Sequence, residues 1–246
     1  MSIEWTDDAI VLGARPFGET QALAEVFARA HGRAAAIVHG GASKRNKPTL
    51  QSGNLVRVTW KARTSDQLGF FAPMDLMEPH AARLLDDPAA LAALSAAVDL
   101  MRAGTAERQA YTGLYDALVV LIESLSGADH WPAIYTRFEL GLLAELGYGI
   151  DLTACALTGD TSDLAFVSPK SGRAASREAG APYADKLLRL PPFLTDSAAP
   201  VESGDVADAF ALAGYFIERR IFDRQGQGMP DSRRRLIEAL GHRGRL

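Results

Sequence analysis

Residues 54–63, with the sequence NLVRVTWKAR, alternate between apolar and polar side chains more clearly than any other stretch of the chain. Val56, Val58 and Trp60 fall on one face of an extended strand, and Arg57 and Lys61 fall on the other. A period of two residues is typical of a strand with one face in a core and the other in solvent. The stretch therefore predicts a strand with an apolar inner face and a basic outer face.

Four further runs in the first 80 residues have the length and composition of strands. They cover residues 9–12, 20–28, 33–39 and 67–77, and Gly32 stands at the expected turn between the second and third of the five strands in chain order. Five short strands in so few residues predict a small closed β-barrel. The OB-fold is the common nucleic-acid-binding barrel of this size.

Beyond residue 86 the pattern changes to that of helices. Asp87 followed by Pro88 reads as a cap and first turn. Apolar residues then recur at helical spacing in five stretches. Residues 151–200, rich in Gly, Pro, Ser and Thr, show no such spacing and predict an irregular insert. We therefore expect an α+β protein, with an OB-fold domain over 1–80 and an all-helical domain over 81–246 that carries the insert at about 151–200.

Composition excludes several classes of protein. The chain of 246 residues is 48% apolar and 23% charged, as expected for a globular protein rather than a disordered one. The first residues lack the basic start and apolar run of a secretory signal, and no apolar run is long enough for a membrane span. Cys155 is the only cysteine, so neither an intrachain disulfide nor a cysteine zinc cluster can form. We expect a cytoplasmic protein without metal or cofactor.

Charge is distributed unevenly along the chain, although the net charge is only −4. The window 29–63 contains eight basic residues and no Asp or Glu, while the other 18 basic residues stand against all 30 acidic ones. The eight are Arg29, Arg33, Lys44, Arg45, Lys47, Arg57, Lys61 and Arg63. Such asymmetry points to a surface that binds a polyanion.

The loop GGASKRNKP, residues 40–48, is the strongest local feature of this window. Lys and Arg neutralise phosphates, and a loop can follow a flexible single strand. Phe17, Trp60, Phe70 and Phe71 would add base stacking if they were exposed. Alternation instead places Trp60 and one of the two neighbouring phenylalanines in the core. The alternative interpretation is an ordinary solvated loop beside an ordinary barrel core.

A second basic cluster lies between residues 219 and 245. Its members are Arg219, Arg220, Arg224, Arg233, Arg234, Arg235, Arg243 and Arg245. Arginine suits the recognition of phosphate or carboxylate, but cations also stabilise the C-terminal ends of helices. The sequence favours neither interpretation over the other.

Catalytic motifs are missing from the sequence. Neither a GxSxG elbow nor an HExxH pair is present, and the five histidines are scattered without ligand spacing. The loop at residues 40–44 lacks the spacing of a phosphate-binding P-loop. We therefore expect a binding protein and not an enzyme, although a site assembled from distant residues stays open.

Four segments in series resemble the RecO family of recombination mediators. They are AIVL at 9–12, RPFGET at 15–20, HGR at 31–33 with the basic loop after it, and MPDSRRR at 229–235. The resemblance runs along nearly the whole chain. It implies a DNA repair and recombination protein that binds single- and double-stranded DNA and anneals complementary strands. It also implies that the protein, together with RecR, helps to load RecA on DNA coated by single-stranded DNA-binding protein (SSB).

The resemblance and the charge pattern together assign candidate residues. For DNA we assign Arg33, Lys44, Arg45, Lys47, Arg57, Lys61 and Arg63. The resemblance implies that the acidic tail of SSB docks on the helical domain, where Arg219, Arg220 and Arg224 are the candidates. The alternative is a non-catalytic adaptor whose basic barrel binds an acidic protein.

The insert departs from the family pattern. In the family that this chain resembles, many members carry two CxxC pairs in this segment, and these pairs form a zinc knuckle. In this chain Cys155, Thr158, Ser176 and Ala179 stand at the four positions. One thiol cannot hold a structural zinc ion, so we expect a knuckle-like insert without metal.

Overall fold

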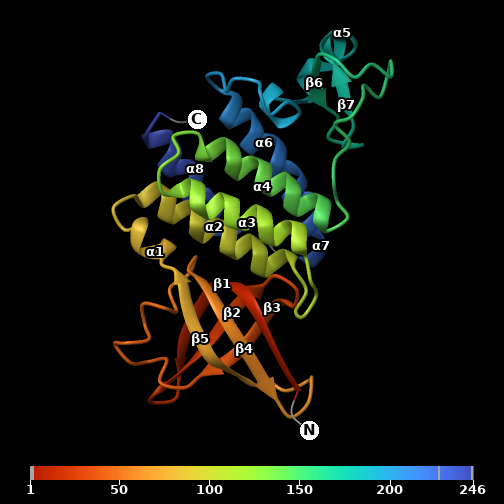
Figure 1. The fold of residues 1–246 in the computed structure, drawn as a ribbon. Helices are drawn as coiled ribbons and strands as arrows, with labels where there is room; N and C mark the ends of the chain where they lie inside the picture. Colours follow the sequence, from red (N-terminus) through yellow and green to blue (C-terminus); the bar gives the residue numbers. More distant parts are fainter. Residues whose placement is uncertain (1–2, 227, 245) are drawn as a thin grey trace. The chain divides into compact units, whose positions relative to one another are not determined.

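The computed structural model describes residues 3–226, 228–244 and 246. The chain forms two compact units, Met1–Gly127 and Ala128–Leu246. Figure 1 shows a barrel formed by the N-terminal strands, and α-helices dominate the rest of the chain. The protein is thus of the α+β class that the sequence predicts. No helix in the described residues is long and apolar enough to cross a membrane.

The first unit contains a closed five-stranded barrel. Its strands are joined in the order β1-β2-β3-β5-β4, with β3 and β5 parallel and all other pairs antiparallel. The strands are β1 (Ile3–Phe17), β2 (Gln21–Ala28), β3 (Gly32–Val38), β4 (Leu55–Ala62) and β5 (Phe70–Glu78). This is the barrel of an OB-fold.

Strand β1 closes the barrel because it is long enough to pair on both sides. Its first half pairs with β4 and its second half with β2. A register shift between Val11 and Gly13 bends the strand where it changes partner. The sequence predicted only residues 9–12 of this strand. Residues 3–8 are mostly polar, so they do not read as a buried strand until β4 lies beside them.

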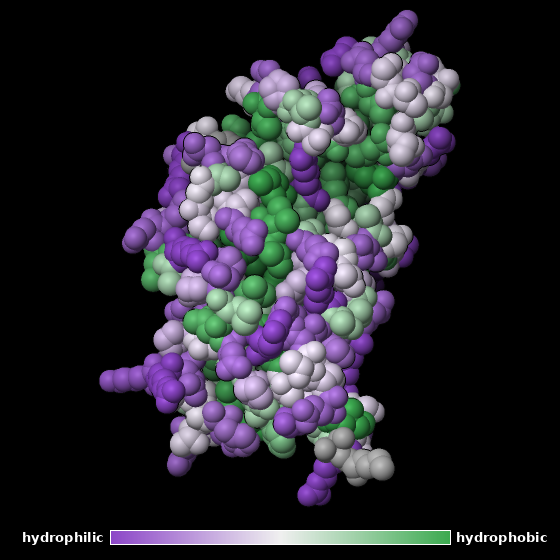
Figure 2. All heavy atoms as spheres, in the orientation of Figure 1, coloured by the Kyte–Doolittle hydropathy of each residue, from purple (hydrophilic) through white to green (hydrophobic). Residues whose placement is uncertain are grey.

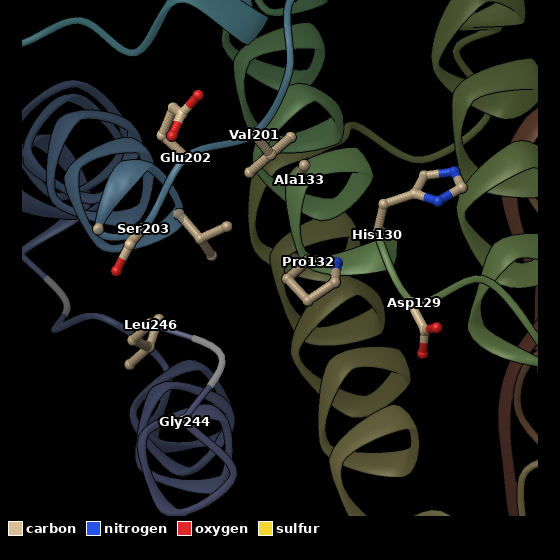
Figure 3. Close-up of a pocket in the computed structure, with 11 residues that line it drawn as sticks. Asp129, His130, Pro132, Ala133, Val201, Glu202, Ser203, Gly244 and Leu246 are labelled. Atoms are coloured by element: carbon tan, nitrogen blue, oxygen red, sulfur yellow. The ribbon is translucent and has the colours of Figure 1, made fainter.

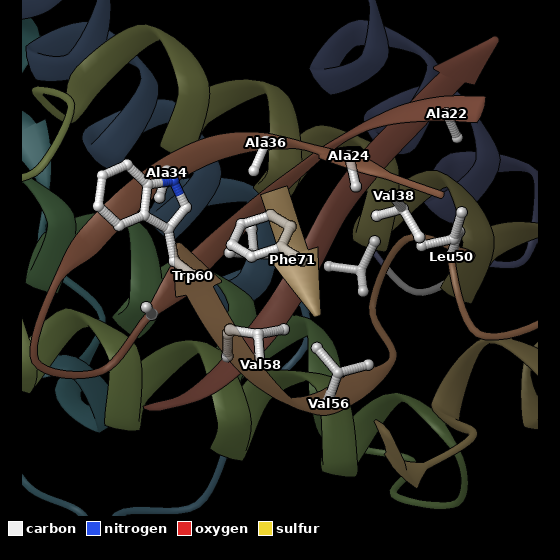
Figure 4. Packing of buried hydrophobic residues seen from close by; sticks show 14 of the residues in the cluster. Ala22, Ala24, Ala34, Ala36, Val38, Leu50, Val56, Val58, Trp60 and Phe71 are labelled. Atoms are coloured by element: carbon white, nitrogen blue, oxygen red, sulfur yellow. The ribbon is translucent and has the colours of Figure 1, made fainter. Parts of the chain in front are cut away.

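Small residues on β2 and β3 make room for two large aromatic side chains in the barrel. Figure 4 shows Trp60 and Phe71 inside the barrel with alanines of β2 and β3. Both aromatic residues are almost fully buried, at 4% and 2% exposed, whereas Phe70 is 41% exposed. The alternation argument is therefore confirmed for Trp60 and for one of the two phenylalanines.

Three helices complete the first unit: α1 (His80–Arg83), α2 (Pro88–Gly104) and α3 (Thr112–Leu125). Asp87 caps α2 by accepting hydrogen bonds from the backbone N–H groups of Ala89 and Ala90, as the sequence predicts. The ring of Phe27, on the outside of β2, stacks against Tyr115 of α3 at 6.4 Å. These helices share a compact unit with the barrel, and the predicted division at residue 80 stays a prediction.

Buried His80 gives the first unit a dependence on pH. Burial, followed by the charge of Arg83, lowers the pKa of His80 below 6.5, although Glu123 and Glu78 act in the opposite direction. The Nδ1 atom has no hydrogen-bond partner among the described residues. Neutral histidine is thus favoured in the folded state, and the unfolded chain binds more protons below pH 6.5. The free energy of unfolding should fall as the pH drops below that value.

We expect His80→Phe to reduce the loss of stability at low pH. The substitution removes the titrating group and keeps an aromatic ring in the site. Urea unfolding of the wild type and the variant between pH 7.5 and pH 5 measures the difference. His39→Gln is the matched control, because His39 is exposed on the same unit. Equal pH profiles for wild type and His80→Phe would contradict the assignment to His80.

The second unit is built on α4 (Trp131–Glu145) and α6 (Asp205–Ile217). A π-helical turn (Glu218–Phe222), α7 (Asp223–Gln225) and α8 (Asp231–His242) come after α6. The irregular insert carries more regular structure than the sequence predicted. Its three strands, β6 (Leu164–Val167), β7 (Ala174–Ser176) and β8 (Leu188–Arg189), form a small sheet in the order β7-β6-β8, and α5 (Arg177–Gly180) comes directly after β7. Strands of two to four residues are too short to show alternation.

Candidate nucleic-acid interface

The basic loop between β3 and β4 is built from consecutive turns. Backbone hydrogen bonds join Ser43 to Gly40, Lys47 to Ser43, and Leu50 to Lys47. The side chain of Asn46 donates to the carbonyl oxygen of Gly40 and holds the two ends of the first turns together. The loop thus has a defined course, which turns the side chains of Lys44, Arg45 and Lys47 outward into solvent.

Four of the eight cations in the window 29–63 have no carboxylate partner among the described residues. They are Lys44, Arg45, Lys47 and Arg63, and all four are exposed. On the face shown in Figure 2, hydrophilic side chains project from the barrel. Unpaired exposed cations are the groups that a phosphate backbone neutralises most readily, because no internal ion pair has to break.

Arg57 and Lys61 of β4 are paired with acids of β1. The guanidinium of Arg57 binds both carboxylate oxygens of Asp8, at 2.8 and 3.0 Å, and the pKa of Arg57 is raised by this hydrogen bonding and by the negative charge. The Nζ atom of Lys61 lies 3.2 Å from Glu4. The antiparallel register places each pair directly across two strands. The cations of β4 are therefore partly neutralised by residues outside the window.

Arg33 is held still more firmly inside the first unit. Its guanidinium lies 2.7 Å from Glu25 and donates to the carbonyl oxygen of Thr105. Glu25 also pairs with Arg102 of α2 at 2.8 Å. One carboxylate on β2 thus joins two arginines, one on β3 and one on α2. This arrangement ties the barrel to its helices and explains Arg33 without a ligand.

The three candidate arginines of the second unit lie beside aromatic rings. Arg219 and Arg224 are exposed, and Arg220 is half-buried. Arg220 sits 4.4 Å from the ring centre of Phe216, and Arg224 sits 5.1 Å from that of Tyr148. Burial, followed by the positive charge of Arg224, lowers the pKa of Arg220. In the described part of the chain, no carboxylate lies at ion-pair distance from these three groups.

Two other arginines of the C-terminal cluster are held by carboxylates. Arg233 is buried and paired with Glu139 at 2.7 Å, and Arg234 pairs with Glu238 and Asp231 on the surface of α8. Arg245 lies outside the described residues. Arg233 thus has a structural role in the core, whereas Arg234 is exposed but already paired.

A pocket of about 430 Å³ opens between the start of α4, residues 201–206 and Leu246 (Figure 3). Its described lining includes the carboxylates of Asp129 and Glu202 and contains no Lys or Arg. An acidic peptide would meet repulsion there. An anionic partner therefore suits the group of Arg219, Arg220 and Arg224 better than it suits this pocket.

The four knuckle positions of the insert come together, but their chemistry does not suit zinc. The Cys155 thiol is hydrogen-bonded to Thr158 and Ser176, and Ala179 packs against the cluster that contains Cys155. Hydrogen bonds, first from Thr158, lower the pKa of Cys155 to about 6. One thiol, two hydroxyls and a methyl group do not make a zinc site. Among the described residues, no group of three or more His, Cys, Asp or Glu could hold a metal ion.

Comparison with known proteins agrees with the fold. The family model for the N-terminal part of recombination protein O matches residues 1–80, and that for its C-terminal part matches residues 85–227. The DNA repair protein RecO of Phenylobacterium zucineum is 48% identical over 99% of this chain and 100% of its own length.

The DNA repair protein RecO of Hyphomonas neptunium is 45% identical over 97% of this chain and 98% of its own length. That of Rhodospirillum centenum is 47% identical over 96% of this chain and 94% of its own length. Both family models and these full-length relatives point to the same group, and the chain belongs to the RecO family of DNA repair proteins.

Proposed function

We propose that this protein binds single- and double-stranded DNA through the basic loop and anneals complementary strands during recombinational repair. The observation that carries the proposal is the group of four exposed, unpaired cations on the barrel: Lys44, Arg45, Lys47 and Arg63. Arg33, Arg57 and Lys61 belong to the proposed surface only in a lesser role, since each already has a carboxylate partner. Family membership supports DNA as the polyanion.

Annealing by such a surface needs no bond chemistry. Two single strands repel each other, and a cationic surface that binds both lowers the repulsion and raises their local concentration. Pairing then becomes faster without an energy source. The protein works, on this proposal, as a binding protein in the cytoplasm at the nucleoid.

Partners are proposed from the family and from the second unit. We propose that the acidic tail of SSB docks at Arg219, Arg220 and Arg224, where guanidinium groups without carboxylate partners lie beside Tyr148 and Phe216. Annealing of SSB-coated strands and, with RecR, the loading of RecA belong to the same proposal. Carboxylate recognition by arginine is the chemistry that such a tail would use.

The decisive experiment is annealing of two complementary fluorescent oligonucleotides, with and without SSB and without ATP. We expect faster annealing that weakens steeply with salt. Four phosphate contacts predict a slope of log K against log salt of about −3 for a single strand. A protein that neither anneals nor binds DNA at low salt would contradict the proposal and favour an adaptor for an acidic protein.

A further inference from the structure

The outer surface of β1, β2, β3 and β5 carries a strip of mixed apolar and polar residues beside the basic loop. Strand register places Arg15, Leu23, Ile37 and Phe70 in one row across the four strands. A second row, nearer the loop, contains Phe17, Gln21 and His39, since Phe17 pairs with Gln21, and the side chain of Gln21 contacts that of His39 at 3.1 Å.

These side chains point away from the core. The inward positions of the same strands are filled by small residues and Phe71, as Figure 4 shows for β2, β3 and β5. Phe17 is 40% exposed and Phe70 is 41% exposed. Leu23 and Ile37 between them are half-buried. Two aromatic rings thus stand partly in solvent on the outside of the barrel.

Charge complementarity identifies the occupant. His39 lies 5.6 Å from the ring of Phe70, and the chain passes directly from His39 into the basic loop with Lys44, Arg45 and Lys47. Arg15, exposed at the other end of the row, has no carboxylate partner among the described residues. A ligand on this strip therefore meets a ring at each end, Leu23 and Ile37 between the rings, and cations at Arg15 and in the basic loop. Unpaired bases on a phosphate backbone have this combination of groups.

We propose that Phe17 and Phe70 are base-stacking residues, and that they make this protein prefer single-stranded DNA over a duplex. This inference rests on the proposed DNA binding and adds the reason for strand preference. Three strand spacings separate β1 from β5 around the barrel, roughly 14 Å, so the two rings take different bases. A duplex keeps its bases stacked on each other and offers these rings nothing but its backbone.

The test compares a thymidine oligonucleotide with an abasic oligonucleotide of equal length and charge. Affinity is measured by fluorescence anisotropy over a salt series. We expect the wild type to bind the thymidine strand at least about tenfold more tightly. Each substitution, Phe17→Ala or Phe70→Ala, should reduce this preference by about fivefold or more, the effect of one stacked base. The salt slope should not change, because no phosphate contact is lost.

Two further variants separate stacking from other causes. Phe70→Trp should retain the preference and Phe70→Leu should lose it, because leucine is apolar but has no ring face. Leu76→Ala is the matched control, since Leu76 is 40% exposed on the same strand and lies outside the strip. Its affinity should equal that of the wild type.

The outcomes distinguish this inference from the proposed function. If the wild type binds both oligonucleotides equally, with the expected salt slope, the stacking inference is wrong and the proposed DNA binding stands. If Phe17→Ala and Phe70→Ala keep the full preference, the bases bind elsewhere and the inference is again wrong. If the wild type binds neither oligonucleotide at low salt, both proposals are wrong and the strip is a surface for a protein.

Discussion

Glu139→Ala should destabilise the second compact unit by about 3–5 kcal/mol, because it leaves the charge of Arg233 buried without a partner. The side chain of Glu139 is fully buried and that of Arg233 is 6% exposed. Two parallel hydrogen bonds of 2.7 and 2.8 Å join them, and Arg233 also donates to the carbonyl oxygen of Phe210.

The surroundings of the pair show how closely it is enclosed. Burial acts to lower the pKa of Arg233, but the charge and hydrogen bonds of Glu139 prevail, so the pKa is raised overall. Gly214 of α6 lies against the guanidinium, and a Cβ atom there would stand only 2.8 Å from Nη1. Glycine weakens a helix interior, so its presence is explained by the space that Arg233 needs.

Hydrogen exchange of peptides from α4, α6 and α8 measures this effect on the second unit alone. Arg234→Ala is the matched control, since the ion pairs of Arg234 with Glu238 and Asp231 are exposed. This substitution should lower the free energy of unfolding by less than about 1 kcal/mol. The double variant Glu139→Leu and Arg233→Met should recover much of the stability, because no charge then remains buried. Equal losses for Glu139→Ala and Arg234→Ala would contradict the structural role of the pair.

Replacing Lys44, Arg45 and Lys47 together by alanine should weaken single-strand binding at low salt by at least about tenfold. The salt slope should become shallower by about 2, since three phosphate contacts are lost. The fold should not change, because all three side chains are exposed and the turns of the loop are closed by backbone groups and Asn46. Unfolding curves and anisotropy titrations give the two measurements.

Arg57→Ala serves as the comparison for the triple variant. Arg57 is exposed but is bound to Asp8, so its removal leaves an unpaired carboxylate and should change the salt slope by less than 1. A triple variant with the slope of the wild type would show that DNA binds away from the loop. If Arg57→Ala changed the salt slope more than the triple variant does, the DNA-binding surface would have to be assigned to β4.

The distribution of charge along the sequence predicted the exposed cations of the loop correctly, but it did not predict that the cations of the strands are paired. No Asp or Glu interrupts residues 29–63, yet Asp8 and Glu4 neutralise Arg57 and Lys61. These partners lie 49 and 57 positions apart in the chain, and only the pairing of β1 with β4 brings them together. The cations of the loop have no carboxylate at ion-pair distance among the described residues.

The aromatic residues illustrate the same limit. Alternation placed Trp60 and one of the two neighbouring phenylalanines inside, but it did not decide between Phe70 and Phe71. That choice depends on the start of β5 and on its parallel pairing with β3 at Ile37. Arg15 and Phe17 had no visible relation to Phe70 in the sequence. The register of four strands joins them in neighbouring rows on the outside of the barrel.

The sequence by itself determined the fold class, the five strands of the barrel, the cap at Asp87 and the basic loop, because each depends on residues near one another in the chain. Tertiary structure alone decided which cations are free, where Arg233 finds Glu139, and which rings face solvent. Each of these depends on pairs of residues far apart in the chain. Local propensity and periodicity are short-range signals, whereas the neutralisation of a charge or the burial of a ring depends on what the fold places beside it.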